Sequence, residues 1–310
     1  MPHNQVQRAV CTCDGITAPK GSEKMTRFGP AGNSNSFYDK GYKSTIQAPE
    51  YLFNMGLNAY EYQCGRGVKV NEDTAKTLRE NAEKFGVKLS LHAPYFISLS
   101  SVEEATRLKS IDYILQSARA ADLMGADRII VHSGSCSKIT REEALNLAKD
   151  TLALAQKALD ENNLSHIHIC PETMGKVNQL GTLEEVIELC KVSERFIPCV
   201  DFGHLNARTF GGIKTADDYD KILTLMEDNL GERAKTFHSH FSKIEYTTPG
   251  GEKRHLTFED TTFGPDFSPL AEVLVRRGFT PTIICESDGT QAEDAKQMSD
   301  MYKSAKEKIK

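Results

Sequence analysis

Residues 88–101 read KLSLHAPYFISLSS. The first four residues alternate between polar and apolar, a pattern typical of a β-strand with one buried face. Where this strand should end, the chain places the imidazole of His92, the rigid turn former Pro94 and the phenol of Tyr95, followed by small hydroxyl side chains. What these side chains do depends on where the other histidines and carboxylates fall, and that depends on the fold.

Strand-like runs alternate with longer helical runs along most of the chain. Residues 71–86 have helical character, begin at Asn71 as a cap and stop at Gly86. Residues 140–163 begin with Thr140 and Glu143 in capping-box spacing. Eight strands are predicted, over residues 26–29, 58–63, 88–92, 128–132, 166–172, 198–201, 234–240 and 280–286.

This alternation predicts a closed parallel sheet. Strands separated by helices favour parallel pairing, because each crossover helix covers one face of the sheet. A sheet of this kind that closes on itself is a (β/α)8 TIM barrel, which is the fold that we predict. The alternative is an open, doubly wound sheet. It is disfavoured because no glycine-rich phosphate loop leads from the first strand into a helix.

Length and composition fit one such domain. The chain has 310 residues, of which 39% are hydrophobic, and this is ample for a sizeable core. We predict a single barrel domain over residues 25–310, preceded by an N-terminal extension over residues 1–24. Within the extension, Cys11 and Cys13 hint at a metal site. Two cysteines at this spacing without a second pair favour a tail or a strand instead.

Charge and cysteine content bear on location and partners. The net charge of −5 gives no global attraction to nucleic acid, although a local basic groove remains compatible with it. We expect no membrane segment, because no apolar run approaches the length of a span and the N-terminus lacks the apolar core of a signal peptide. The scattered cysteines are typical of reduced thiols. We therefore expect a cytoplasmic monomer, with no protein partner evident.

Six consecutive predicted strands end in side chains that can bind metal. Five of the nine histidines lie at or just beyond these ends. In chain order the residues are His92, His132, Glu172, Asp201, His204, His238, His240 and Glu286. Active sites of barrels form at the carboxyl ends of the strands, so these side chains should meet at one rim.

A single histidine at a strand end is usually structural, but the whole set indicates metal. Buried carboxylates and imidazoles that cluster repel one another or stay unsatisfied unless a cation organises them. Mixed nitrogen and oxygen donors suit zinc or manganese, and so many donors indicate at least two ions. On the seventh strand we predict His240, which is nearer the rim, as the ligand rather than His238. His166 and His168 lie lower in the predicted barrel and are interpreted as structural.

The segments HAPYFISLSS, VHSGS, PETMG, VDFGH and ICES, in that order, resemble the endonuclease IV family of DNA repair enzymes, within the xylose isomerase-like superfamily. The resemblance runs from about residue 27 to residue 286. Its most specific part is HAPY followed by the hydroxyl-rich segment. It implies a barrel that cleaves the phosphodiester bond on the 5′ side of an abasic site in damaged double-stranded DNA, using a three-zinc centre.

The resemblance also implies the role of each residue. Glu172 would bridge two ions, and Glu172 and Glu286 would be the catalytic carboxylates. Tyr95 and Arg66 would contact the DNA strand. The expected cofactor is Zn²⁺, as two or three ions, with Mn²⁺ as a substitute. The implied metal ligands are His92, His132, Glu172, Asp201, His204, His240, His255 and Glu286.

The sequence departs from the family pattern after the seventh strand. The family places an Asp-x-His pair there for its third zinc, whereas residues 251–255 read GEKRH and put Lys253 where aspartate is expected. Glu252 or Asp260 could substitute, or the third ion could be absent. The chain is therefore interpreted as a divergent member of the family.

Two other functions compete with the nuclease. A sugar isomerase or epimerase of the same superfamily would need one divalent ion, held by Glu172, Asp201, Glu286 and a histidine of the seventh strand. It would not need both His92 and His132 as ligands, so these two residues discriminate. A non-catalytic metal-binding barrel that serves as a scaffold is disfavoured, because a rim rich in ionisable groups costs stability and usually signals function.

A nuclease with this net charge needs local positive charge to attract DNA. Lysines and arginines near the strand-end loops would supply it and would make binding sensitive to salt. The candidates are Arg27, Arg66, Lys69, Lys243, Lys253 and Arg254.

Overall fold

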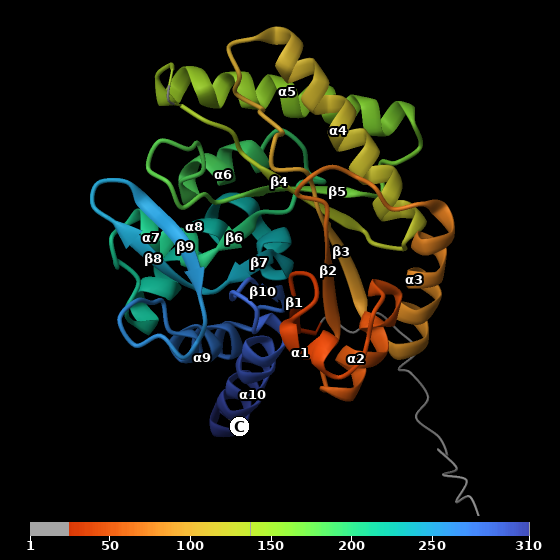
Figure 1. Cartoon of the computed structure of the whole chain (residues 1–310). Coiled ribbons are helices and arrows are strands. Elements are labelled where there is room, and N and C mark those ends of the chain that lie inside the picture. Colours follow the sequence, from red (N-terminus) through yellow and green to blue (C-terminus); the bar gives the residue numbers. More distant parts are fainter. Residues whose placement is uncertain (1–24, 137, 310) are drawn as a thin grey trace, which may run out of the picture.

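The computed structural model describes residues 25–136 and 138–309 (Figure 1). The predicted extension over residues 1–24, with Cys11 and Cys13, lies outside the described residues. Eight strands form one parallel sheet. They are β1 (Arg27–Pro30), β2 (Ala59–Gln63), β3 (Lys88–His92), β4 (Arg128–His132), β5 (His168–Glu172), β6 (Cys199–Asp201), β7 (His238–Phe241) and β10 (Thr282–Cys285).

The strands run around the sheet in the order β1-β10-β7-β6-β5-β4-β3-β2. The two strands that end this order also meet, through a parallel bridge between Ala31 and Glu61 and a bond of 3.1 Å from the Asn58 N–H to the Phe28 carbonyl oxygen. Gly29 permits this approach, because a Cβ there would lie 1.7 Å from the carbonyl oxygen of Ala59. The sheet is thus a nearly closed barrel with helices between its strands, and the predicted fold is confirmed.

The helices lie outside the barrel and carry the predicted end signals. Asn71 Oδ1 accepts a bond of 2.9 Å from the Thr74 N–H. Thr140 and Glu143 form the expected capping box. The helices are α1 (Asn35–Asp39), α2 (Ala48–Asn54), α3 (Glu72–Phe85), α4 (Glu104–Leu123), α5 (Arg141–Glu161), α6 (Leu183–Cys190), α7 (Phe202–Arg208), α8 (Ala216–Leu230), α9 (Phe267–Arg277) and α10 (Gln291–Ile309), with short 3-10 turns at Thr45–Gln47 and Gly231–Thr236.

Besides shifts of one or two residues at strand ends, two features differ from the sequence prediction. The seventh barrel strand begins at His238 rather than at residue 234, because Gly231–Thr236 closes a 3-10 turn first. After β7 the chain forms a hairpin of β8 (Lys243–Thr247) and β9 (Gly251–Leu256), which lies outside the barrel sheet and is joined to the segment after β5 by an antiparallel bridge between Lys176 and Gly251. The hairpin lies over the carboxyl ends of β5 to β7 (Figure 1).

Side chains alternate between the two faces of each barrel strand, which fixes what points inward. In β4, Ile129 and Val131 pack under the helices, whereas Ile130 joins a small interior cluster with Cys170 and Cys199. Two residues further along each of these three strands, the inward position is taken by His132, Glu172 and Asp201. The barrel interior therefore changes from apolar to ionisable toward the carboxyl ends of the strands.

Candidate metal centre

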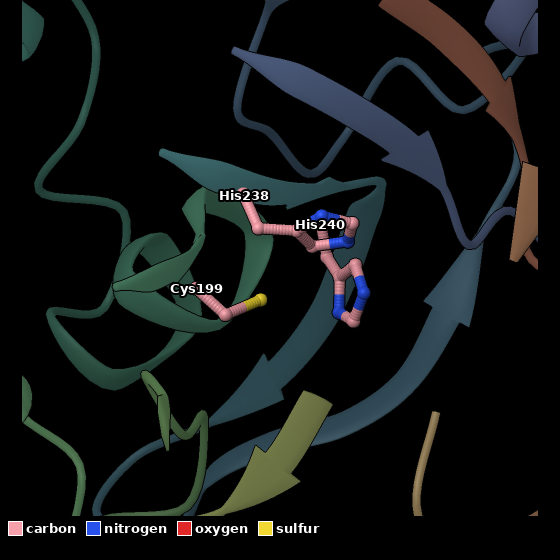
Figure 2. A group of neighbouring side chains, drawn as sticks. All are labelled: Cys199, His238 and His240. Carbon is pink, nitrogen blue, oxygen red and sulfur yellow. The ribbon is translucent and has the colours of Figure 1, made fainter. Parts of the chain in front are cut away.

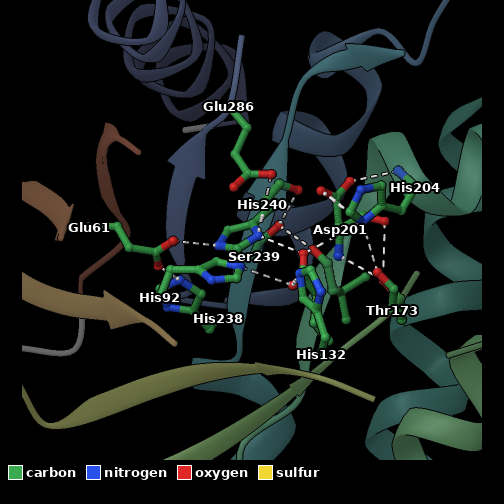
Figure 3. Close-up of polar contacts among 12 residues, drawn as sticks. Glu61, His92, His132, Thr173, Asp201, His204, His238, Ser239, His240 and Glu286 are labelled. Atoms are coloured by element: carbon green, nitrogen blue, oxygen red, sulfur yellow. Dashed lines mark hydrogen bonds and ion pairs between the residues drawn. The ribbon is translucent and has the colours of Figure 1, made fainter. Parts of the chain in front are cut away.

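The ionisable residues predicted at the strand ends converge on one cavity of about 370 Å³ (Figure 3). Asp201 and His240 are completely buried beside it. The cavity is lined by His92, Tyr95, His132, Glu172, Met174, Lys176, Gln179, His204, Glu252, His255 and Glu286. All eight predicted metal ligands therefore lie in or beside a single site.

Glu172, at the end of β5, stands at the middle of this site. Its Oε2 lies 3.4 Å from both His92 Nε2 and His132 Nε2. Its Oε1 lies 2.8 Å from His240 Nδ1 and 3.5 Å from His204 Nδ1. One buried carboxylate therefore faces two separate sets of imidazoles, which is the geometry of a bridging ligand.

Asp201 links the barrel to helix α7. It ends β6 and caps α7, with its Oδ1 accepting a bond of 2.7 Å from the backbone N–H of His204. The cap orients the other oxygen, Oδ2, toward the site, where it has no hydrogen-bond partner among the described residues. The first turn of the same helix delivers His204, so one short D-x-x-H segment supplies two donors.

Three of the histidines are each fixed by one ring nitrogen. His92 Nδ1 lies 2.8 Å from the Ala93 carbonyl oxygen, and His204 Nδ1 lies 2.9 Å from that of Thr173. His240 Nε2 lies 3.0 Å from Oε1 of Glu61. A nitrogen that donates its hydrogen to such an acceptor leaves the lone pair of the other nitrogen available to a metal.

The hairpin contributes a further group of donors. Glu252 Oε2 lies 3.5 Å from His204 Nε2, and the His255 ring is held by a contact of 2.8 Å between its Nδ1 and Ser242 Oγ. The rings of His204 and His255 are 5.6 Å apart. Of the two residues considered as substitutes for the family aspartate, Glu252 is the one in the site. Asp260 instead accepts bonds from two backbone N–H groups of its own loop.

A β-bulge explains why Glu252 can occupy this position. In the hairpin Glu245 pairs with Arg254, but the next residue, Tyr246, pairs with Glu252, so Lys253 is the extra residue of a bulge. A bulge shifts the alternation of side chains by one residue. Glu252 and His255, three residues apart, therefore reach the same site, as residues two apart would in a regular strand.

Within the described part of the chain, five sets of donor residues have their atoms within 4.8 Å of one another, and three of these sets, which we call the donor groups, together contain all eight predicted ligands. Glu172 Oε2 and Asp201 Oδ2, both buried, have no hydrogen-bond partner among the described residues. Buried carboxylate oxygens without donors are costly, and a cation would remove that cost. The combination of imidazole and carboxylate donors fits zinc. The groups are His92, His132 and Glu172; Glu172, Asp201, His240 and Glu286; and His204, Glu252 and His255.

Burial and neighbouring charged groups act in opposite directions on the pKa values of three residues in this site. Burial lowers the pKa of His132 to about 3, although Glu172 acts against it, so this imidazole is neutral with a free lone pair. Burial would also lower the pKa of His204, but the carboxylates of Asp201, Glu252 and Glu172 outweigh it and raise that pKa to about 9. For Glu286, burial raises the pKa above its ordinary value, against the effects of His240 and His255.

Tyr95 and Arg66 lie at the rim. The Tyr95 ring stacks on that of His132 with ring centroids 5.3 Å apart, and 56% of the residue is exposed. The Tyr95 N–H donates to the Gly65 carbonyl oxygen over 3.1 Å. A Cβ at Gly65 would lie 2.3 Å from the Tyr95 ring, so a side chain there would displace the ring from its present position. Arg66 follows with an exposed side chain.

Glu61 is a carboxylate of this region that the sequence prediction missed. It lies on β2, is fully buried, and its Oε2 is 2.9 Å from Nε2 of His238. Burial lowers the pKa of His238 to about 4, and its Nδ1 has no hydrogen-bond partner among the described residues. Figure 2 shows His238 and His240 with Cys199 beside them. The signal was present in the alternation of AYEYQ, which turns Glu61 inward between two tyrosines.

Three of the basic residues considered as DNA contacts lie away from the site or pair with a carboxylate. Arg27 begins β1 and therefore lies at the opposite end of the barrel from the site. Lys253 and Arg254 form ion pairs with Glu245 at 2.5 and 2.6 Å. Lys176, which was not considered, lines the cavity.

The two histidines interpreted as structural lie outside the donor groups. His166 Nε2 is 2.8 Å from Asp122 Oδ1 at the surface. His168 begins β5, and its Nδ1 is 2.6 Å from the Arg195 carbonyl oxygen.

Comparison with known proteins gives the family. The model of the family described as xylose isomerase-like TIM barrel matches residues 49–305. A protein of Methanocaldococcus jannaschii, described as uncharacterized, is 34% identical over 86% of this chain and 93% of its own. A protein of Acholeplasma laidlawii named "Probable endonuclease 4" is 27% identical over 78% of this chain and 82% of its own. The chain therefore belongs to the xylose isomerase-like TIM barrel family.

Two solved structures with different named activities share the fold of this chain. A D-tagatose 3-epimerase-like protein has a TM-score of 0.68 at 19% identity, covering 92% of this chain and 100% of its own. Endonuclease IV from Thermus thermophilus has a TM-score of 0.61 at 19% identity, covering 91% and 99%. Fold likeness alone therefore does not separate nuclease from epimerase. No helix of the described part of the chain is long and apolar enough to cross a membrane.

Proposed function

We propose that the protein is a metal-dependent phosphodiesterase of the endonuclease IV type, which cleaves DNA on the 5′ side of abasic sites. The observation that carries this proposal is the presence of three donor groups around one cavity, two of which share Glu172. The proposed cofactor is Zn²⁺, as two or three ions, with Mn²⁺ as a substitute. The 27% identity to a protein named "Probable endonuclease 4" supports it.

In this proposal each donor group holds one ion. His92 and His132 share the first with Glu172, and Asp201, His240 and Glu286 share the second with the same carboxylate. The third group is His204, Glu252 and His255. Ions held by these residues would lower the pKa of a bound water and neutralise charge on a phosphate.

The protein side chains would position the reacting groups. Glu172 bridges two donor groups, and Glu286 reaches the cavity with 15% of its side chain exposed, whereas Glu172 is 1% exposed. Glu286 is thus the carboxylate best placed to take a proton from an attacking water. Tyr95 and Arg66 stand at the rim, where an abasic strand would lie across the opening. We propose that the substrate is damaged double-stranded DNA and that the protein acts as a cytoplasmic monomer.

The second candidate is a sugar epimerase with one divalent ion. The group of Glu172, Asp201, His240 and Glu286 would suffice for it, and this observation keeps the candidate open. An epimerase leaves the other two groups without a role, although both place imidazoles against carboxylates in the cavity. The nuclease uses all three groups, and we favour it for that reason.

The test incubates metal-loaded protein with a duplex that carries one abasic site, at low salt, beside a panel of ketoses. The proposal expects cleavage 5′ to the lesion, lost after chelation and restored by Zn²⁺ or Mn²⁺. His132→Ala should abolish cleavage, and His166→Ala, which changes a surface histidine, serves as the matched control. Interconversion of a sugar without strand cleavage would contradict the nuclease and support the epimerase.

A further inference from the structure

Glu61 is a buried carboxylate directly beneath the candidate metal centre. It is 0% exposed and projects from β2 into the barrel, where no lysine or arginine contacts it among the described residues. Its neighbours there are two histidines of β7 on the far side of the barrel, His238 and His240 (Figure 3). Burial of a carboxylate costs free energy unless hydrogen-bond donors surround it, so the neighbours of Glu61 must supply such donors.

Four side-chain groups surround the two oxygens of Glu61. Oε1 lies 3.0 Å from His240 Nε2 and 3.2 Å from Gln63 Nε2. Oε2 lies 3.0 Å from Ser90 Oγ and 2.9 Å from His238 Nε2. With two donors on each oxygen, the group accepts on every side, which is the role of an ionised carboxylate. Both histidines then carry hydrogen on Nε2.

This arrangement gives the two histidines different roles. His240 Nε2 donates to Glu61, and its Nδ1 points at Glu172 Oε1, 2.8 Å away, and toward Glu286 Oε2, 3.6 Å away. His238 also donates through Nε2, but its Nδ1 faces no donor or acceptor among the described residues. His240 is therefore poised to bind a cation, whereas His238 completes the shell of Glu61.

The acceptor behind His240 differs from those behind the other anchored histidines. His92 and His204 donate to the carbonyl oxygens of Ala93 and Thr173, which are neutral. The acceptor for His240 is an anion. An anionic acceptor makes the opposite ring nitrogen a stronger donor to a metal and fixes the orientation of the ring.

We propose that Glu61 is a positioning residue for the metal centre: it holds His240 with hydrogen on Nε2 and so commits Nδ1 to the ion shared by Glu172, Asp201 and Glu286. This inference rests on the metal centre of the proposed function. It adds a contribution from β2, a strand that supplies no direct ligand, and explains why one histidine of β7 binds while its neighbour does not.

The first experiment compares Glu61→Gln with Ser90→Ala. Glutamine keeps the size of the side chain but removes the charge and replaces one acceptor oxygen with a donor. Ser90→Ala removes a neutral donor from Glu61 and leaves the bond to His240 in place, so it is the matched control. Zinc affinity is measured by competition with a chromophoric chelator, and the visible spectrum of the Co²⁺-loaded protein reports the ligand geometry.

The expected result is a loss of about 10- to 100-fold in affinity for the ion at this position in E61Q, with a changed Co²⁺ spectrum. S90A should retain the affinity and spectrum of the unaltered protein. Equal affinity and spectra in E61Q and the unaltered protein would overturn the inference. An unaltered protein that binds no metal would instead contradict the proposed function, so the two failures are distinguishable.

A second measurement needs no variant that alters Glu61. Histidine labelled with ¹⁵N in the zinc-loaded protein reports the tautomer of each ring, with His240 assigned by the loss of its signals in His240→Gln. The inference expects hydrogen on Nε2 and a metal-bound Nδ1 for His240, and hydrogen on Nε2 for His238. Hydrogen on Nδ1 of His240 in the zinc-loaded protein would overturn it, even if E61Q failed to fold.

Discussion

The site has two parts that are built differently. The proposed barrel-strand ligands are carried by strands bonded to neighbours on both sides. The proposed helix–hairpin ligands, His204, Glu252 and His255, are carried by α7 and by a hairpin outside the barrel sheet. The barrel-strand ligands are His92, His132, Glu172, Asp201, His240 and Glu286.

This difference shows which part of the centre the fold controls. A barrel strand cannot shift by one residue without turning all its inward side chains outward, so its ligands are set by register. The hairpin is not part of the barrel sheet and meets the segment after β5 through a single bridge, and the bulge at Lys253 brings a glutamate into the site from a position where the family pattern has none. We infer that the helix–hairpin ligands are the adaptable part of the centre.

The largest effect is expected from Glu172→Gln, because this carboxylate faces both barrel-strand donor groups. One neutral amide cannot bridge two cations, so zinc content should fall by two ions per chain and cleavage should fall to background. Elemental analysis of the dialysed protein and the abasic-duplex assay measure these effects. Unchanged zinc content in this variant would show that Glu172 does not bridge.

A smaller, more selective effect is expected within β7. His240→Ala should lose the ion held with Asp201 and Glu286, together with activity. His238→Ala should keep its metal but lower the free energy of unfolding by about 1–3 kcal/mol, because it leaves an oxygen of Glu61 without its donor. Metal content and denaturant unfolding separate the two. Metal retained in His240→Ala and lost in His238→Ala would reverse the assignment.

The helix–hairpin ligands can be removed without the others. Glu252→Gln should release one ion per chain and leave the two barrel-strand ions in place, with activity reduced rather than abolished. Deletion of Lys253 should keep all the metal, because Glu252 would then stand two residues before His255 in a regular strand, on the same face. Lys253→Ala keeps the bulge and should keep all the metal. Loss of an ion in the deletion variant would contradict this account of how Glu252 and His255 come to share a face.

The metal-free protein should show a pH effect through His204. Its pKa is raised to about 9 by the nearby carboxylates, which outweigh burial. Because the folded value lies above the ordinary one of 6.5, the stabilisation is complete below about pH 6.5 and is lost as pH rises through 9. It amounts to at most about 3 kcal/mol. Unfolding of the metal-free protein and of His204→Gln at pH 6 and 9.5 tests this. A difference between them that does not shrink with pH would contradict it.

The barrel-strand part of the site could be predicted from the sequence more completely than the helix–hairpin part. The alternation of strand-like and helical segments predicted the barrel. The residues predicted at the strand ends, from His92 to Glu286, lie around one cavity. Glu61 was missed because it lies in the middle of a strand. Its role is indicated only by its inward orientation and by its contacts with two histidines across the barrel. Those contacts join β2 to β7 across 177 and 179 residues of sequence.

The hairpin was missed for a different reason. Its strands, Lys243–Thr247 and Gly251–Leu256, do not take part in the alternation of strand and helix that identifies a barrel. The role of Glu252 depends on a one-residue bulge, and residue spacing alone cannot indicate a bulge. Lys253 therefore stood at the position expected for a ligand, and Glu252 was only one of two substitutes.

The central claim is that this rim holds a multinuclear metal centre. The most direct test is anomalous diffraction at the zinc absorption edge from crystals of the zinc-loaded protein. The account predicts one peak between His92, His132 and Glu172, and a second between Glu172, Asp201, His240 and Glu286. A third is predicted between His204, Glu252 and His255. A single peak, at the Asp201 and Glu286 position alone, would contradict the account and favour a one-metal epimerase.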